Sequence, residues 1–138
     1  MVEAQNTRIV QDAYAAFGRG DIQALLALFD DSITWKPVTG AGSQVPTAGE
    51  RRGKAEVAEF FRIVAETTHF EQFDPREFVA QGDKVVALGH YAAKTSTGKG
   101  FESDFVMVFT LRDGKVSRFQ EFCDSAALNA AFEGVMVQ

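Results

Sequence analysis

Glu121 and Asp124 are the two carboxylic acids whose positions could support proton transfer. Glu121 alternates with Phe119 and Cys123, so these three side chains share one face of a predicted strand over residues 116–123. Where this face lines a closed apolar pocket, burial raises the pKa of the Glu121 carboxyl and makes it an acid or a base. The alternative is that Glu121 points to solvent or pairs with a basic residue across the sheet, since carboxylates are rarely buried.

Three residues besides Glu121 could take part in the same chemistry. Asp124 ends the predicted strand and precedes a predicted helix, so it is either an N-cap or a carboxyl at the pocket rim. His90 shares a strand face with apolar neighbours, and it is either a structural histidine or a proton shuttle and substrate donor. Tyr14, on the predicted first helix, has an apolar ring and a polar tip, which suits a pocket wall or the margin of a core.

The apolar residues predict a wide interior built from large side chains. The chain has 13 Phe against one Trp and two Tyr. Side chains of this size, spread over helices and strands alike, suggest a hollow that large rings surround. The side chains expected to contact a bound molecule are Trp35, Phe17, Phe61, Phe105, Met107, Phe119 and Cys123.

Motifs for metal, phosphate or nucleophilic chemistry are missing from the sequence. His69 and His90 are the only histidines, and they are not spaced as a metal-binding pair with carboxylates. There is no glycine-rich phosphate loop and no GxSxG nucleophile elbow. We therefore expect no metal and no cofactor.

The composition limits which binding partners and which cellular location we expect. The formal charge of −5 argues against nucleic acid and against anionic membranes, both of which require clustered Lys and Arg. No apolar stretch reaches membrane-spanning length, and the first seven residues form no apolar run. Cys123 is the only cysteine, which excludes an internal disulfide and fits a reducing cytoplasm. We expect one cytoplasmic domain over residues 1–138.

The order of elements predicts an α+β fold. Helical spacing is found over residues 7–17, 22–29 and after Gly53, and consecutive strands follow it. Asp113-Gly114 between two apolar runs is a strong hairpin signal. Pro75 marks an edge strand or a bulge, and the last few residues are expected to fray. The other predicted elements are a strand at 33–36, a loop at 38–52, an irregular strand at 70–78, strands at 85–95, 105–111 and 116–123, and a helix at 125–132.

The opposite face of the last predicted strand suggests a protein partner. It carries Arg118, Gln120 and Phe122, a mixture of charged, polar and apolar side chains. Such a mixed face is typical of a sheet covered by a second subunit. The loop at 38–52 is long enough to be a lid over a pocket, or it is a surface excursion.

Two sequence segments carry a family resemblance. The opening VQDAYAAFGRGDIQALLALFDDSITWKP and the close DGKVSRFQEFCD resemble the SnoaL-like group of the nuclear transport factor 2-like superfamily, over roughly residues 7–128. The resemblance implies a conical α+β barrel, in which a curved antiparallel sheet wraps around a long helix and encloses a mostly apolar cavity. It also implies homodimers packed through the outer face of the sheet.

The resemblance allows the catalytic residues of several related enzymes to be compared with the matching positions of this chain. Ketosteroid isomerases of this superfamily carry a catalytic Asp before the Pro that ends the first strand, where this chain has Lys36. Their second, protonated Asp falls at Phe105 in this chain. The polyketide cyclases use an acid or base Asp at the end of the last strand, which matches Asp124, but Phe105 and Met107 replace their polar partners. An Asp-Arg-Asp trio of the epoxide hydrolase kind is not found.

Two functions are therefore expected from the sequence. The first is a cofactor-independent isomerase, cyclase or lyase, in which Glu121 or Asp124 moves a proton beside a carbonyl and Tyr14 or His90 stabilises the oxyanion. The second is a non-catalytic module that binds a hydrophobic small molecule or acts as a dimeric scaffold. An enzyme should bring Glu121 and one of the other polar residues to a common point.

Overall fold

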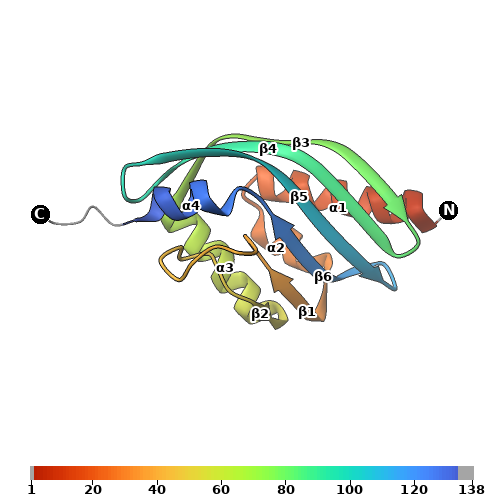
Figure 1. Ribbon diagram of the computed structural model, residues 1–138. Helices are drawn as coiled ribbons and strands as arrows, with labels where there is room; N and C mark the ends of the chain where they lie inside the picture. The colour runs from red at the N-terminus through yellow and green to blue at the C-terminus, as the bar shows by residue number, and fades with distance from the viewer. Residues whose placement is uncertain (1, 134–138) are drawn as a thin grey trace, which may run out of the picture.

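The computed structural model describes residues 2–133 (Figure 1). The expected fraying of the last few residues falls outside this range. The elements in chain order are α1 (Val2–Gly18), α2 (Ile22–Ala27), β1 (Phe29–Lys36), β2 (Arg51–Arg52), α3 (Gly53–Thr67), β3 (Thr68–Gln81), β4 (Lys84–Thr95), β5 (Gly100–Arg112), β6 (Lys115–Phe122) and α4 (Ser125–Phe132).

The strands form one six-stranded sheet in the order β2-β1-β6-β5-β4-β3. The four consecutive strands β3 to β6 are antiparallel, as expected. β1 was expected to extend an antiparallel sheet, but it runs parallel to β6, so the sheet is mixed. The long strands curve over α1, and the helices gather on the concave side (Figure 1). This arrangement is the predicted α+β class.

Alternation along the strands decides which side chains face the helices. Along β4, Val85, Ala87 and Tyr91 are buried, whereas His90 and its period-two neighbours lie on the outer face. The concave face and the helices share one apolar cluster that includes Val10, from α1. The helix stripes and the inner strand face thus meet in a single core.

Two predicted boundaries were wrong near the start of the sheet. The second helix ends at Ala27, and Phe29 to Ser32 belong to β1. The sequence DDS reads locally as a breaker, but Phe29 pairs with Val116 of β6, and this pairing in the folded chain overrides the local signal. The N-cap at Asp21 is confirmed, because its carboxylate accepts a hydrogen bond from the Ala24 amide.

β3 is an edge strand with two register shifts. One shift lies between Phe70 and Gln72, and the other between Pro75 and Glu77. Pro75 was predicted to mark an edge or a bulge, and both are found. Such shifts bend a strand and interrupt its ladder of hydrogen bonds.

The segment between β1 and β2 is irregular, as predicted, but it is tied down by its neighbours. The Arg51 guanidinium donates to the carbonyls of Thr47, Ala48 and Gly49 at 2.6–2.9 Å. Val38 and Val45 pack against residues of α4 in a second apolar cluster. The loop is therefore a packed layer beside α4.

None of the helices described between residues 2 and 133 has the length and hydropathy needed to cross a membrane.

Candidate functional site in an aromatic cavity

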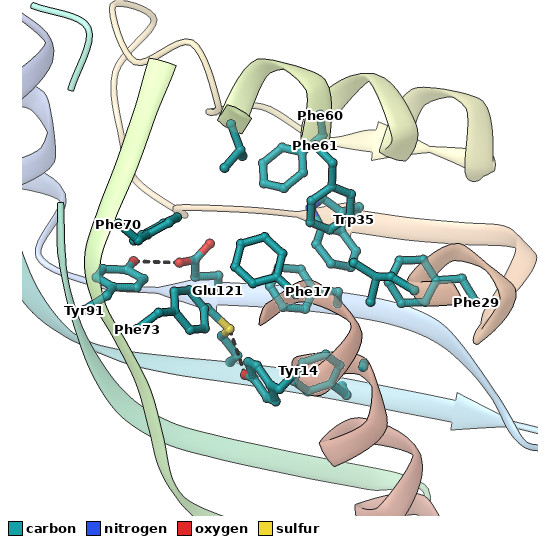
Figure 2. Close-up of a pocket in the computed structure, with 16 residues that line it drawn as sticks. Tyr14, Phe17, Phe29, Trp35, Phe60, Phe61, Phe70, Phe73, Tyr91 and Glu121 are labelled. Atoms are coloured by element: carbon teal, nitrogen blue, oxygen red, sulfur yellow. Dashed lines mark hydrogen bonds between the residues drawn. The ribbon is translucent and has the colours of Figure 1, made fainter. Parts of the chain in front are cut away.

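A cavity of about 90 Å³ lies between the concave face of the sheet and the helices. It is smaller than the cavity of about 150 Å³ that is known to admit one benzene ring. Figure 2 shows aromatic rings from α1, α3 and the sheet surrounding it. Its lining residues are Ala13, Tyr14, Phe17, Leu25, Phe29, Trp35, Phe60, Phe61, Val64, Phe70, Phe73, Tyr91, Met107, Phe109, Phe119 and Glu121.

Glu121 is the only carboxylic acid among these lining residues, and it is 5% exposed. The Tyr91 hydroxyl donates to Glu121 Oε2 at 2.6 Å (Figure 2). The Val38 amide donates to Oε1 at 3.2 Å. The proposal that Glu121 faces solvent, or a basic partner, does not describe this side chain. The prediction that Glu121 shares a strand face with Phe119 and faces the hollow describes it correctly.

Burial raises the pKa of the Glu121 carboxyl, because loss of hydration disfavours the charged form. The bonds from Tyr91 and Val38 favour the ionised form and oppose this effect, but burial is the larger cause. A carboxyl with a raised pKa carries a proton at higher pH than usual. It can therefore give or take a proton at a higher pH than an ordinary glutamate.

Tyr91 is one of two residues at the candidate site that the sequence analysis missed. Its hydroxyl is the closest polar partner of Glu121, and burial raises the pKa of that hydroxyl, so it stays a neutral donor. The sequence predicted its neighbour His90 instead, because an ordinary histidine changes charge within the physiological pH range. The alternation along β4 could have indicated Tyr91, because Val85, Ala87 and Tyr91 share the apolar face.

Val38 was also missed, because its contribution comes from the backbone. Its φ of +39° lies in the left-handed region, which a β-branched residue rarely occupies. In this conformation the Val38 amide donates to the Glu121 carboxyl, and the next amide, Thr39, donates to the Glu121 carbonyl at 2.9 Å. The strained turn after β1 thus fixes the carboxyl in place.

Tyr14 brings a second hydroxyl to the cavity. It donates to the Met107 thioether at 2.9 Å, and Met107 pairs directly with Glu121 across β5 and β6. Burial raises the pKa of the Tyr14 hydroxyl as well, and the nearby Glu121 carboxyl adds to this. A thioether is a weak acceptor, so a ligand oxygen could replace it as the partner of Tyr14.

Five of the seven predicted contact residues line the cavity, namely Trp35, Phe17, Phe61, Met107 and Phe119. Trp35 stacks on Phe119 with ring centroids 3.8 Å apart. The buried indole N–H of Trp35 has no hydrogen-bond partner among the described residues.

Phe105 and Cys123 are outside the lining. The Phe105 ring is buried behind the wall, where it packs against Tyr91 with centroids 5.0 Å apart. Cys123 is half-buried and packs against both apolar clusters. These two residues support the lining rather than form it.

The structure does not bring Asp124 or His90 to Glu121. Asp124 is exposed and caps α4, where its carboxylate accepts from the Ala127 amide at 3.0 Å. His90 lies on the outer face of the sheet, within 2.9 Å of carboxylates of Glu102 and Asp104. These carboxylates, Asp104 first, raise the pKa of His90.

No group of three or more potential metal ligands is found among residues 2–133. The candidate site is an aromatic cavity with one buried carboxyl and two tyrosine hydroxyls. The polar groups of such a site can hydrogen-bond one or two oxygen atoms of an apolar molecule and can move a proton.

The sequence from residue 10 to residue 119 matches the family model of the SnoaL-like domain. The match covers most of the chain, so this protein belongs to the SnoaL-like family. No curated protein sequence matches the chain.

Solved structures place the fold in the NTF2-like class. An NTF2-like protein from Burkholderia xenovorans LB400 is 34% identical, with a TM-score of 0.85 and coverage of 95% of this chain and 98% of that one. An NTF2-like protein of unknown function from Burkholderia pseudomallei K96243 is 26% identical, with a TM-score of 0.82 and coverage of 94% and 98%. TerC, co-crystallised with polyporic acid, is 27% identical, with a TM-score of 0.76 and coverage of 94% and 99%.

Proposed function

We propose that this protein binds a flat, apolar small molecule that carries a carbonyl group, and that Glu121 moves a proton on the carbon beside that carbonyl. The observation that carries the proposal is the buried Glu121 carboxyl, bonded to Tyr91 and facing an aromatic cavity. The solved structure of TerC with polyporic acid supports small-molecule binding by this fold. The expected class of activity is a cofactor-independent isomerase, cyclase or lyase.

In the proposed reaction, the ionised Glu121 carboxylate takes a proton from the carbon, and the electron pair moves onto the carbonyl oxygen. Because the pKa of Glu121 is raised, the carboxylate is a stronger base than an ordinary Glu once it has ionised. Tyr14 then donates a hydrogen bond to the oxyanion in place of its bond to Met107. Tyr91 holds the carboxyl and, with its own pKa raised, is not deprotonated by it.

Exchange of protons for deuterons at the methyl group of acetophenone tests this chemistry without a known substrate. In D₂O, the wild-type protein should accelerate the exchange above the rate in buffer, as followed by NMR. Glu121→Gln should reduce the exchange to the buffer rate, because an amide cannot accept the proton. Tyr14→Phe should slow it by about tenfold or more, as expected for loss of one oxyanion donor.

His90→Gln and Asp124→Asn are the matched controls, because both residues lie away from the cavity. Both variants should accelerate the exchange of the acetophenone methyl protons as much as the wild type does. Binding of acetophenone without any acceleration would contradict catalysis and support the non-catalytic binding module. Full exchange activity in Glu121→Gln would remove Glu121 as the base.

We further propose that a second copy of the chain covers the outer face of the sheet. Phe122 and Val79 are 40% and 56% exposed on this face, and an apolar stripe lies between them. Glu102 and Asp104 lie near one end of the strands, whereas Lys84 and Arg118 lie near the other. A two-fold axis that reverses the strand direction would set acidic against basic ends. The half-buried apolar residues of the stripe are Val86, Leu88, Val106 and Val108.

Sedimentation equilibrium tests this dimer. Phe122→Glu should raise the dimer dissociation constant at least tenfold, because it buries an unpaired charge. Ala65→Glu adds the same charge on the exposed side of α3 and should leave the dimer intact. A wild-type protein that sediments as a monomer at micromolar concentration would contradict the proposed dimer.

Cys123 is consistent with a cytoplasmic location, which we infer as part of the same proposal. It is the only cysteine of the chain, and burial raises the pKa of its thiol to about 11. A thiol with so high a pKa is mostly protonated and reacts slowly. A single free thiol fits a reducing compartment.

A further inference from the structure

We infer that the aromatic cavity is the inner half of a longer binding site, whose outer half is a surface hollow between the end of α1 and β3. This inference rests on the proposed function, because it assigns a shape and a charge to the same ligand. The ligand is then an amphiphile, with an apolar ring inside and a neutral or cationic polar end outside. Neither end alone would fill both halves.

The surface hollow has a volume of about 370 Å³ and adjoins the cavity. The two spaces share four wall residues, Tyr14, Phe17, Phe70 and Phe73, and the other residues of the hollow are Gly18, Glu71, Gln72 and Pro75. All four shared rings are half-buried, so they lie at the border between interior and surface.

Three of these rings form the partition between the two spaces. Phe17 lies 5.1 Å from Phe73 and 6.2 Å from Phe70, and Phe70 lies 5.0 Å from Phe73, between ring centroids. Because the cavity is too small for one aromatic ring as it stands, a ligand enters only when its wall moves. Rotation of these rings would join the cavity and the hollow.

The backbone around the partition favours such a movement. β3 is the edge strand, so one side of it has no neighbouring strand within the sheet. Register shifts at Phe70–Gln72 and Pro75–Glu77 bracket the section that carries Phe73, and they weaken its pairing with β4. α1 ends at Gly18, beside Phe17. These are the features expected of a segment that opens at low cost.

The polar residues of the hollow select the outer end of the ligand. Glu71 is exposed at the bulge and lies in the hollow with Gln72. No lysine or arginine lines the hollow. An anionic group placed there would therefore be repelled by the Glu71 carboxylate without a compensating positive charge. A carboxylate or phosphate end is disfavoured, whereas an amine or hydroxyl end is accepted.

Three aryl ketones test the inference by calorimetric titration. Acetophenone reports on the inner cavity alone. 6-Amino-1-phenylhexan-1-one and 6-oxo-6-phenylhexanoate place a cation and an anion, respectively, on an equal tail in the outer hollow. The aminoketone should bind about tenfold more tightly than the ketoacid at low ionic strength. Glu71→Gln should bring the ratio of the two affinities to within about threefold, because it removes the selecting charge.

Glu77→Gln is the matched control, since Glu77 is an exposed carboxylate of the same strand outside the hollow. It should keep the wild-type ratio. Equal affinity of both tailed ketones for the wild-type protein, or an equal effect of Glu71→Gln and Glu77→Gln, would overturn the inference even where acetophenone binds. Lack of exchange chemistry with intact charge selection would overturn only the proposed catalysis.

The partition has its own test by stopped-flow fluorescence of Trp35. Phe17→Leu should speed association of the aminoketone at least threefold, because a smaller, more flexible side chain opens the wall more readily. Phe132→Leu makes the same change in the second apolar cluster, away from both the cavity and the hollow, and should not alter the rate. Equal association rates for Phe17→Leu and the wild type would exclude this wall as the route.

Discussion

Replacing Glu121 with glutamine is expected to make the protein more stable than the wild type at neutral and alkaline pH. In the unfolded chain, Glu121 should titrate near its ordinary pKa of about 4.3. In the folded protein, burial raises the pKa, so folding favours the protonated form. The glutamine variant has no charge to desolvate at this position. Its stability therefore lacks the pH dependence that ionisation of Glu121 gives the wild type.

The direction of the effect follows from the order of ionisation. Below pH 4 the carboxyl is protonated in both states, so pH does not alter its contribution to stability. Above that pH the unfolded state ionises first, and the wild type loses about 1.4 kcal/mol of stability per pH unit relative to the variant. The loss stops where the folded carboxyl also ionises.

Urea denaturation at several pH values between 4 and 8 measures this difference. The two free energies of unfolding should be closest at pH 4 and diverge as the pH rises, with the variant above the wild type. The variant Glu77→Gln, which changes an exposed carboxyl, should run parallel to the wild type. A constant offset between Glu121→Gln and the wild type would mean that Glu121 is not buried as described.

Gly89→Ala is expected to destabilise the protein by about 3 kcal/mol, at the upper end of overpacking effects. A Cβ at this position would lie 2.4 Å from the Asp74 carbonyl oxygen and 2.5 Å from Cζ of Phe105. Phe105 is fully buried, so its ring has no free space into which it could move. Displacement of Phe105 would also move Tyr91, against which it packs.

Gly18→Ala is the control for this change, because a Cβ at the end of α1 would meet nothing within 4 Å. Its stability should stay within about 1 kcal/mol of the wild type or rise slightly, as alanine favours the helix. Thermal and urea unfolding of both variants measure the two effects. Similar stabilities for Gly89→Ala and Gly18→Ala would contradict the close packing of β3, β4 and Phe105.

Much of the fold was predictable because its signals are local. The Asp113-Gly114 turn, the N-caps at Asp21 and Asp124, and the edge position of Pro75 follow from residue type and spacing alone. The parallel pairing of β1 with β6 was not predictable in this way. It joins segments that are far apart in the sequence, and no periodicity encodes it.

The candidate site was predictable only in part. Glu121 was found because its strand alternates and places a carboxyl among apolar residues. Tyr91 was not predicted, because the sequence does not show that β4 and β6 bring their inner faces to a common point. Val38 acts through a backbone amide, which leaves no mark in the residue type.

The central claim is that the Glu121 carboxyl is buried at the cavity wall and holds its proton to a higher pH than an ordinary glutamate. Carbon-13 NMR of the protein labelled at glutamate side chains measures this directly, with Glu121→Gln to assign the signal. The account predicts that the Glu121 signal titrates well above pH 4.3, the ordinary midpoint for glutamate. A Glu121 signal that titrates near or below pH 4.3 would contradict it.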